Sequence, residues 1–430
     1  MSCKKLEEVL KYSAKLENTN ILKTTSVTLS SNDYINSILW GGQKWDLGSD
    51  EKLTYYFVPP PSDNYPNEIY GILRSKPELT NWEENEKEQM IKGLKKWTDL
   101  VGIEIKEAEN ERNSHLKFYI TQEILGFLAF QVGPTGDSYQ GVGLYVRYKD
   151  QYSKYWTSTL EEGGFGFTTI LHEMGHAVGL AHPHDQGGGS SIFPGVDHSG
   201  DLGDNDLNQN VFTVMSYNDI GTDFNPNSEE DWTTGFAKGP MAFDIAAMYH
   251  LYGLSEDYKL DTNDTNEDSQ YIISSNTNGY VCLYDVSGED TILFEDNTAI
   301  VVDLRPATLK NEVGGGGFVS RIDGSNIGYT IPSGTSIENA TTSGGDDTIY
   351  TTNNIRHIIN GGDGTDTVIY SGDYEDYSIS ISDSGVIEVI KNENSSVTDE
   401  LTNIENLQFN NITITREQIE SGENIDSNMD

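Results

Sequence analysis

The stretch "LHEMGHAVGLAHPHD", residues 171–185, contains four of the eight histidines in this chain of 430 residues. His172 and His176 lie four residues apart, so on a helix their imidazoles project from one face and can share a metal ion. Glu173 follows His172 directly and points to the side, where it can reach a water molecule on the metal without being a ligand itself. The spacing therefore predicts a metal-binding helix.

Gly179 comes three residues after His176, where a left-handed backbone would end the helix and turn the chain sharply. That turn would bring His182 back as a third nitrogen ligand. Three protein ligands leave one coordination position open, which is typical of catalytic zinc sites. The full H-E-x-x-H-x-x-G-x-x-H pattern is far more specific than H-E-x-x-H alone, and it favours this site over a buried helix whose histidines only satisfy hydrogen bonds. His184 is expected to be a solvated loop residue.

The predicted chemistry is metal-assisted hydrolysis of a peptide bond. One zinc ion would lower the pKa of a water towards ~7 and polarise a carbonyl group. Glu173 would take the proton of that water and hand it to the leaving amine, which makes Glu173 the expected general base.

The chain is strongly acidic, with 69 Asp and Glu against 27 Lys and Arg and a formal net charge of −42. This balance disfavours nucleic acid and anionic membrane surfaces as partners, because both would repel the chain. It fits either solubility alone or the binding of Ca²⁺, which prefers oxygen ligands. Cys3 and Cys282 are the only cysteines, so no disulfide framework is expected. No apolar run has the length that spans a bilayer.

Hydrophobic periodicity divides the chain into two kinds of structure. Strand-like and helical patterns alternate up to residue 253, which predicts an α/β (α+β) domain, with Thr168 and Thr169 as caps of the histidine helix. From residue 270 to 415 the segments are short, β-branched and separated by Gly, Asn, Asp and Ser, which is typical of an all-β domain. The predicted parts are an N-terminal segment (1–30), the α/β domain (31–253), a β domain (254–370) and a further β-module (371–430).

Two motifs together resemble a known family. "HEMGHAVGLAHP", His172–Pro183, is similar to the zinc signature of the metzincin peptidases, and Pro183 resembles the serralysin branch. "VMSY", Val214–Tyr217, is similar to the methionine-containing turn that metzincins pair with this signature. The resemblance implies that Met215 forms an apolar floor beneath the zinc ligands. It also implies that Tyr217 is a retractable extra zinc ligand or stabilises the oxyanion.

The resemblance to the serralysin family covers roughly residues 35–370. "DIAAMYHLYG", Asp244–Gly253, looks like the helix that closes the serralysin catalytic domain. The resemblance to this family implies a secreted, extracellular protein that leaves the cell through a type I secretion apparatus, with a secretion signal in the region 371–430. The segment 1–30 would be the propeptide of a zymogen, in which Cys3 either caps the zinc or is a plain free thiol.

"GGDGTDTVI", Gly361–Ile369, fits the calcium-binding repeat G-G-x-G-x-D-x-U-x of a parallel β-roll, with Val368 facing inward. "TSGGDDTIY", Thr342–Tyr350, keeps part of the pattern, including an inward Ile349. The segment between them keeps apolar Ile355 and Ile358. These segments predict a short roll with one or two calcium ions; a loop rich in Asp and Gly is the alternative. The residues expected at the calcium sites are Gly345, Asp347, Gly361, Gly362, Asp363, Gly364 and Asp366. The stretch "SGEDTILF", Ser287–Phe294, is expected to be a plain hairpin.

The sequence therefore predicts a secreted zinc endopeptidase, a monomer that acts on protein and peptide substrates with broad specificity. The strand "GFLAFQV", Gly126–Val132, could pair with extended substrate through the backbone. Two alternatives remain open. One is a narrow-target processing protease or toxin, distinguished by the loop Gln186–Asn210. The other is a non-catalytic, calcium-dependent surface or interaction protein.

Overall fold

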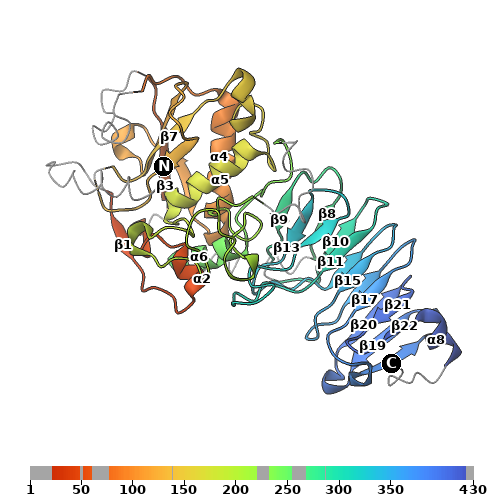
Figure 1. Cartoon of the computed structure of the whole chain (residues 1–430). Helices are drawn as coiled ribbons and strands as arrows, with labels where there is room; N and C mark the ends of the chain where they lie inside the picture. Colours follow the sequence, from red (N-terminus) through yellow and green to blue (C-terminus); the bar gives the residue numbers. More distant parts are fainter. Residues whose placement is uncertain are drawn as a thin grey trace. The chain divides into compact units, whose positions relative to one another are not determined.

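A computed structural model describes residues 22–48, 52–60, 77–137, 139–219, 232–253, 268–285 and 287–422. The described parts form two compact units (Figure 1). The first unit takes in Met1–Thr222, Asn227–Leu260 and Leu309–Gly316, and the second unit takes in the remainder. The predicted domain boundaries at residues 30, 253 and 370 stay predictions, and Cys3 lies outside the described residues.

The first unit is built on a five-stranded mixed sheet. Four of its strands run parallel and the edge strand β6 runs antiparallel to β7. The two strands beside the edge are apolar and buried along almost their whole length, as expected where both faces of a sheet are covered. In sheet order the strands are β4 (Glu104–Glu107), β3 (Lys52–Phe57), β5 (Leu116–Thr121), β7 (Val142–Val146) and β6 (Ala129–Gln131).

Two long helices, α4 (Glu84–Thr98) and α5 (Phe165–Val178), pack against each other. Gly93 of α4 allows the close approach, because a Cβ there would come within 2.6 Å of Ile170 Cγ2. Every residue of α5 from Gly166 to Val178 is buried, which explains its apolar sequence. The prediction that Thr168 and Thr169 cap this helix is wrong, because α5 begins at Phe165, after Gly164.

Shorter elements complete the first unit. The strands β1 (Thr24–Ser26) and β2 (Gln43–Trp45) pair antiparallel. The remaining helices are α2 (Asp33–Ser37), α6 (Ala242–Tyr252) and the 3₁₀ turns η2 (Asp99–Val101), η3 (Glu111–Asn113), η4 (Asp150–Tyr155), η5 (Gly187–Gly189) and η6 (Asp204–Asp206). None of the helices in the described ranges is both long enough and apolar enough to cross a bilayer.

The described strands of the second unit form two sheets. The seven-stranded sheet has the order β18 (Tyr377–Ile381), β19 (Ile387–Lys391), β20 (Thr398–Thr402), β16 (Ile358–Asn360), β14 (Asn339–Thr341), β10 (Thr291–Phe294), β8 (Gln270–Ile273). The eight-stranded sheet has the order β22 (Thr413–Thr415), β21 (Asn406–Gln408), β17 (Thr367–Ile369), β15 (Thr348–Tyr350), β11 (Ile300–Asp303), β12 (Ser320–Ile322), β13 (Gly328–Thr330), β9 (Tyr280–Cys282). Short helices η8 (Tyr374–Asp376), η9 (Asn392–Asn394) and α8 (Arg416–Ser421) follow the later strands.

Strands β14 to β17 go to the two sheets in turn, and β14 pairs in parallel with β16 as β15 does with β17. This is the path of a parallel β-roll (Figure 1). Ile349 and Val368 lie opposite each other in register and are fully buried, as predicted. In the intervening turn Ile359 faces the core, whereas Ile358, predicted to keep the apolar face, is 38% exposed.

The parallel arrangement extends beyond the glycine-rich repeats. The prediction of a plain hairpin at Ser287–Phe294 is wrong, because β10 pairs in parallel with both β8 and β14. At the other end β20 and β21 continue both sheets in parallel. Alternating apolar residues suffice to build such strands, so the repeat motif marks only the glycine-rich turns and not the extent of the roll.

A buried ion pair fixes α4 to the end of β7. Arg147 Nε donates to Glu86 Oε1 at 2.6 Å, and both side chains are almost fully buried. Trp156 Nε1 donates to the same carboxylate oxygen at 2.9 Å. Loss of the Glu86 charge would leave the buried guanidinium of Arg147 without its main counter-charge.

We expect Glu86→Gln to lower the free energy of unfolding of the first unit by about 3 kcal/mol, since it leaves a buried charge without its main partner. Urea denaturation followed by tryptophan fluorescence measures this loss. Glu84→Gln is the matched control, because Glu84 is exposed on the same helix and its ion-pair partner among the described residues is the neighbouring Lys87. Equal stability of the two variants would contradict the prediction.

Candidate metal centre

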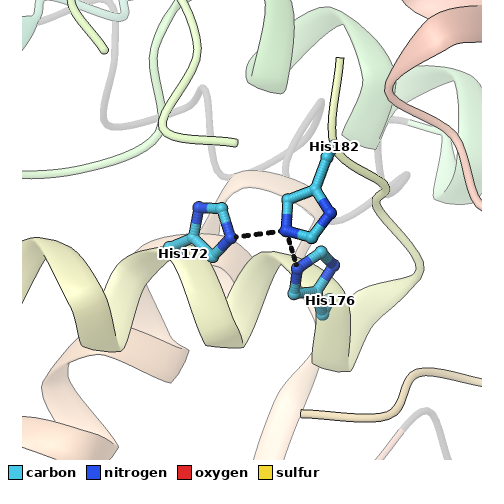
Figure 2. A group of neighbouring side chains, drawn as sticks. All are labelled: His172, His176 and His182. Atoms are coloured by element: carbon cyan, nitrogen blue, oxygen red, sulfur yellow. Dashed lines mark hydrogen bonds between the residues drawn. The ribbon is translucent and has the colours of Figure 1, made fainter. Parts of the chain in front are cut away.

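Three histidines converge in the first unit. His172 and His176 project from α5, and His182 reaches the same point from the loop that follows the helix (Figure 2). His182 Nε2 lies 3.0 Å from His172 Nε2 and 3.0 Å from His176 Nε2. One ligand nitrogen of each ring lies within 4.8 Å of the others, so the three can hold a single ion.

The opposite ring nitrogen of each histidine, Nδ1, is held by an oxygen atom. A hydrogen bond from Nδ1 leaves the lone pair of Nε2 free and fixes the orientation of the ring. The acceptors are Val214 O at 2.8 Å from His172, Leu180 O at 2.9 Å from His176, and Asp185 Oδ2 at 2.6 Å from His182. The histidines are therefore arranged as ligands before any ion binds.

Burial also keeps the two helical histidines neutral. It lowers the pKa of His172 well below its ordinary value and that of His176 to about 3, and the neighbouring histidine rings lower both further. A neutral imidazole is the form that binds a metal. The pair therefore has the protonation state of ligands at neutral pH.

Gly179 makes the turn that returns the chain to the helix. Its φ is +112°, and its N–H donates to His176 O at 3.0 Å. A Cβ at this position would lie 2.4 Å from Gln43 O, so only glycine fits. The next residues are held by a second segment, since Leu180 bridges Leu39 in antiparallel fashion.

Glu173 follows His172 on α5 and has one carboxylate oxygen without a partner among the described residues. Its carboxylate accepts a hydrogen bond from the backbone N–H of Gln131 in β6. Oε2 is buried and has no partner among the described residues. Burial raises the pKa of Glu173 to about 8. A buried unpartnered oxygen is unfavourable unless a donor such as a bound water reaches it, so the carboxylate fits the role of water activation.

The methionine turn lies under α5. Met215 is fully buried, and a Cβ at Gly175 would come within 2.4 Å of its sulfur atom. Asp244, the third residue of α6, holds the turn: Thr213 Oγ1 donates to Oδ1 at 2.6 Å and Val214 N to Oδ2 at 2.8 Å. Because Val214 O is the partner of the first histidine, α6 orients that ligand through this turn.

Sequence reasoning missed three residues of this arrangement: Gly175, Asp185 and Asp244. A carboxylate three residues beyond the third histidine was the available signal for Asp185, and an acidic residue in the first turn of a helix was the signal for Asp244. Gly175 gave no signal, because the space taken by Met215 is a property of the fold.

Tyr217 and His184 stand at the exposed side of the cluster. Tyr217 Oη lies 2.9 Å from His182 Nε2, although the residue is 51% exposed. The prediction that His184 is a solvated loop residue is wrong. Its ring stacks on His182 with centroids 5.0 Å apart, and its Nδ1 is buried. His184, His182 and Asp185 form a second group that could hold a metal ion. His182 belongs to both groups.

In the second unit, the residues predicted to bind calcium lie in adjacent turns of the roll. Three of the glycines are left-handed, with φ of +107° at Gly345, +83° at Gly362 and +149° at Gly364. Gly345 N donates to Asp363 O at 3.0 Å, which joins the two turns. A Cβ at Gly361 would lie 2.4 Å from Asp366 Oδ2, so that glycine leaves room beside the carboxylate.

In each of the two aspartates predicted to bind calcium, one carboxylate oxygen accepts a backbone hydrogen bond and the other does not. Asp347 N donates to Asp366 Oδ1 at 2.9 Å, and Ile300 N donates to Asp347 Oδ1 at 2.9 Å. Oδ2 of each is buried and has no partner among the described residues. Burial, followed by the charges of Asp347, Glu405 and other carboxylates, raises the pKa of Asp366 to about 7. Unpartnered oxygens among like charges suit a hard cation.

These features define a class. A buried helix with H-E-x-x-H, a third histidine behind a glycine turn and a methionine beneath the ligands form the arrangement of a metalloprotease. No family model matches the chain.

Individual proteins are similar over most of its length. Serralysin of Photorhabdus laumondii is 25% identical over 332 residues, which is 74% of this chain and 63% of that protein. Metallopeptidase AprA of Pseudomonas marginalis is 27% identical over 71% of this chain and 61% of its own length. Serralysin of Proteus mirabilis is 27% identical over 72% of this chain and 61% of its own length. The chain thus spans less than two thirds of these relatives, and it is related to the serralysin-type metalloproteases, as its motifs predicted.

We expect Asp185→Ala to weaken zinc binding about 10–100-fold, because His182 would lose the acceptor that orients its ring. Competition with a fluorescent zinc chelator measures the affinity. Asp197→Ala, an exposed carboxylate of the same loop, is the matched control and should bind zinc as the parent does. An unchanged affinity in Asp185→Ala would show that the hydrogen bond is dispensable.

Proposed function

We propose that this protein is a secreted, zinc-dependent endopeptidase that hydrolyses peptide bonds in proteins with broad specificity. One observation carries the proposal: three histidine nitrogens converge within 4.8 Å of one another, and the residue after the first histidine, Glu173, has a buried Oε2 with no partner among the described residues. The similarity to proteins named serralysin and AprA metalloprotease supports it. The donor set fits zinc, because three imidazole ligands leave a coordination position open.

His172, His176 and His182 would hold one zinc ion. When bound, zinc lowers the pKa of a water towards neutrality and polarises the substrate carbonyl. Glu173 accepts the proton of the attacking water at Oε2 and returns it to the leaving amine. The Gln131 N–H keeps the carboxylate in place during both transfers.

Tyr217 would act on the carbonyl oxygen of the substrate. Its hydroxyl lies at His182 Nε2, next to the place where that oxygen would become negative. A hydrogen bond donated there stabilises the oxyanion. In the resting enzyme the same hydroxyl would serve as an extra zinc ligand.

The edge strand β6 offers a place for the substrate backbone. Leu128 O and Val132 N bond to the strand β7, so the backbone groups of Ala129 and Gln131 face the other way. No described strand pairs on that side, and the Gln131 N–H reaches Glu173. An extended peptide paired along this edge would lie next to the general base. Backbone pairing does not depend on substrate side chains, which favours broad specificity.

Calcium would have a structural role in the second unit. The unpartnered oxygens of Asp347 and Asp366, with Gly345 and the segment Gly361–Gly364, would bind one or more calcium ions. Calcium is scarce in a cytosol, so these turns would become ordered after export, which fits extracellular function and a type I secretion apparatus. We further propose that the protein is a monomer made as a zymogen, with residues 1–30 as propeptide.

We expect Glu173→Gln to reduce kcat/KM for casein about 10²–10⁴-fold, because it removes the general base and leaves the metal ligands intact. The assay uses protein loaded with Zn²⁺ and Ca²⁺, with a chelator as second control. Glu104→Gln, on the exposed edge strand β4, is the matched control.

Two outcomes would contradict this proposal. Casein hydrolysis that survives in Glu173→Gln with zinc bound would remove Glu173 from the mechanism. A parent protein that binds zinc, lacks residues 1–30 and still cleaves no casein would favour a narrow-target protease or a non-catalytic binding protein.

The calcium proposal predicts that, in the presence of a chelator, the stability of the folded chain falls as the pH rises. The folded pKa of Asp366, about 7, lies above its ordinary value of 3.8, so the folded chain binds this proton more tightly than the unfolded chain. Stability in EDTA should therefore fall as the pH rises from about 4 to about 7. Calcium favours the ionised carboxylate and should raise the melting temperature more at pH 8 than at pH 5.

Thermal denaturation followed by circular dichroism measures both effects. Asp366→Asn should reduce the pH dependence and the calcium effect together, because it removes the titrating group and its charge. Asp383→Asn, in the exposed turn between β18 and β19, is the matched control. Stability that rises with pH in EDTA would contradict the prediction.

A further inference from the structure

Tyr217 is half exposed, yet its hydroxyl is placed at the histidine cluster. A tyrosine on the surface has several rotamers, and confining it to one costs side-chain entropy. Some neighbouring surface must therefore hold the ring where it is. The packed rings are His182 with centroids 4.7 Å away, His184 at 4.7 Å and His172 at 5.4 Å.

Of these three described rings, His184 is the one that is not a predicted zinc ligand. It lies between two partners, stacked on His182 at an interplanar angle of 21° and tilted by 50° against Tyr217. Its Nδ1 is buried and makes no hydrogen bond to the described residues. A buried ring nitrogen without a partner is unfavourable, so a hydrogen bond at Nδ1 does not explain the position of the ring.

The backbone on both sides of His184 is anchored. Phe193 N donates to Pro183 O at 2.9 Å, and Gly187 N donates to Asp185 Oδ1 at 2.8 Å. Asp185 is also bonded to the ring of His182. The ring of His184 is therefore carried by a rigid turn and presents a fixed surface.

We propose that His184 is a positioning residue, whose ring holds Tyr217 with its hydroxyl at the metal position in the resting enzyme. The proposal rests on the zinc peptidase function proposed above. It assigns to His184 no contact with substrate and no proton transfer; the imidazole acts as a flat surface that selects one rotamer of Tyr217. Removal of the ring should let Tyr217 turn into solvent, where it is neither a ligand nor an oxyanion donor.

The test replaces zinc by Cu²⁺, which histidine sites bind and which gives a visible absorption band when a tyrosinate oxygen is a ligand. We compare the parent with His184→Ala, His184→Phe and Tyr217→Phe. His198→Ala is the matched control, because His198 is an exposed histidine of the same loop. Copper content is measured separately by equilibrium dialysis, so that loss of the band can be distinguished from loss of the metal.

We expect the band in the parent, its absence in Tyr217→Phe, and a reduction to half or less in His184→Ala at unchanged copper content. His184→Phe should keep the band, because it keeps the flat surface. In the zinc enzyme, kcat of His184→Ala should fall about tenfold with little change in KM. This loss is smaller than the roughly 10²-fold expected when an oxyanion donor is removed outright.

A band of equal strength in the parent and in His184→Ala would overturn the proposal, as would a His184→Phe variant that loses the band as fully as His184→Ala. A parent with copper bound but no band would overturn it too, whereas zinc-dependent casein hydrolysis would still uphold the peptidase function. A parent that binds neither copper nor zinc would overturn both.

Discussion

The metal centre depends on a single backbone turn at Gly179. The helix α5 contains only two histidines, so the third must come from elsewhere, and the left-handed residue returns the chain within three positions. No side chain fits there, because the carbonyl of Gln43 occupies the place of a Cβ. The same turn lets Leu180 O accept the hydrogen bond of His176. The end of the helix and the orientation of a ligand are thus one structural feature.

Around this turn the first unit shows a consistent arrangement of polar atoms. Each of the three rings uses Nδ1 for an internal hydrogen bond and turns Nε2 toward the other rings, and Glu173 likewise uses its carboxylate for a bond to Gln131 and keeps Oε2 without a partner among the described residues. Fixed partners on one side reduce the reorganisation that binding and proton transfer require. Asp185 supplies one of these partners directly, and Asp244 holds Val214, whose carbonyl supplies another.

In the second unit, two carboxylates likewise have one oxygen held by a hydrogen bond and the other without a partner among the described residues. Asp347 and Asp366 each accept a backbone hydrogen bond at Oδ1 and keep Oδ2 buried without a partner. Their burial among other carboxylates is unfavourable without a cation, since like charges repel strongly where water is excluded. The acidic composition of the chain therefore includes carboxylates whose position has a specific physical consequence, beyond any effect on solubility.

The sequence by itself determined that His172, His176 and His182 come together, the glycine turn and the inward residues Ile349 and Val368, because short-range spacing dictates which side chains share a face. The methionine turn was expected only from the resemblance to the metzincins. Only the tertiary structure decided what surrounds them. The stacking of His184 on His182, the sulfur of Met215 against Gly175, and the parallel pairing of β10 all join segments through packing that no local pattern records. The hairpin expected at Ser287–Phe294 was wrong for this reason: the same alternation of residues forms antiparallel or parallel strands, and the choice is made by neighbours distant in sequence.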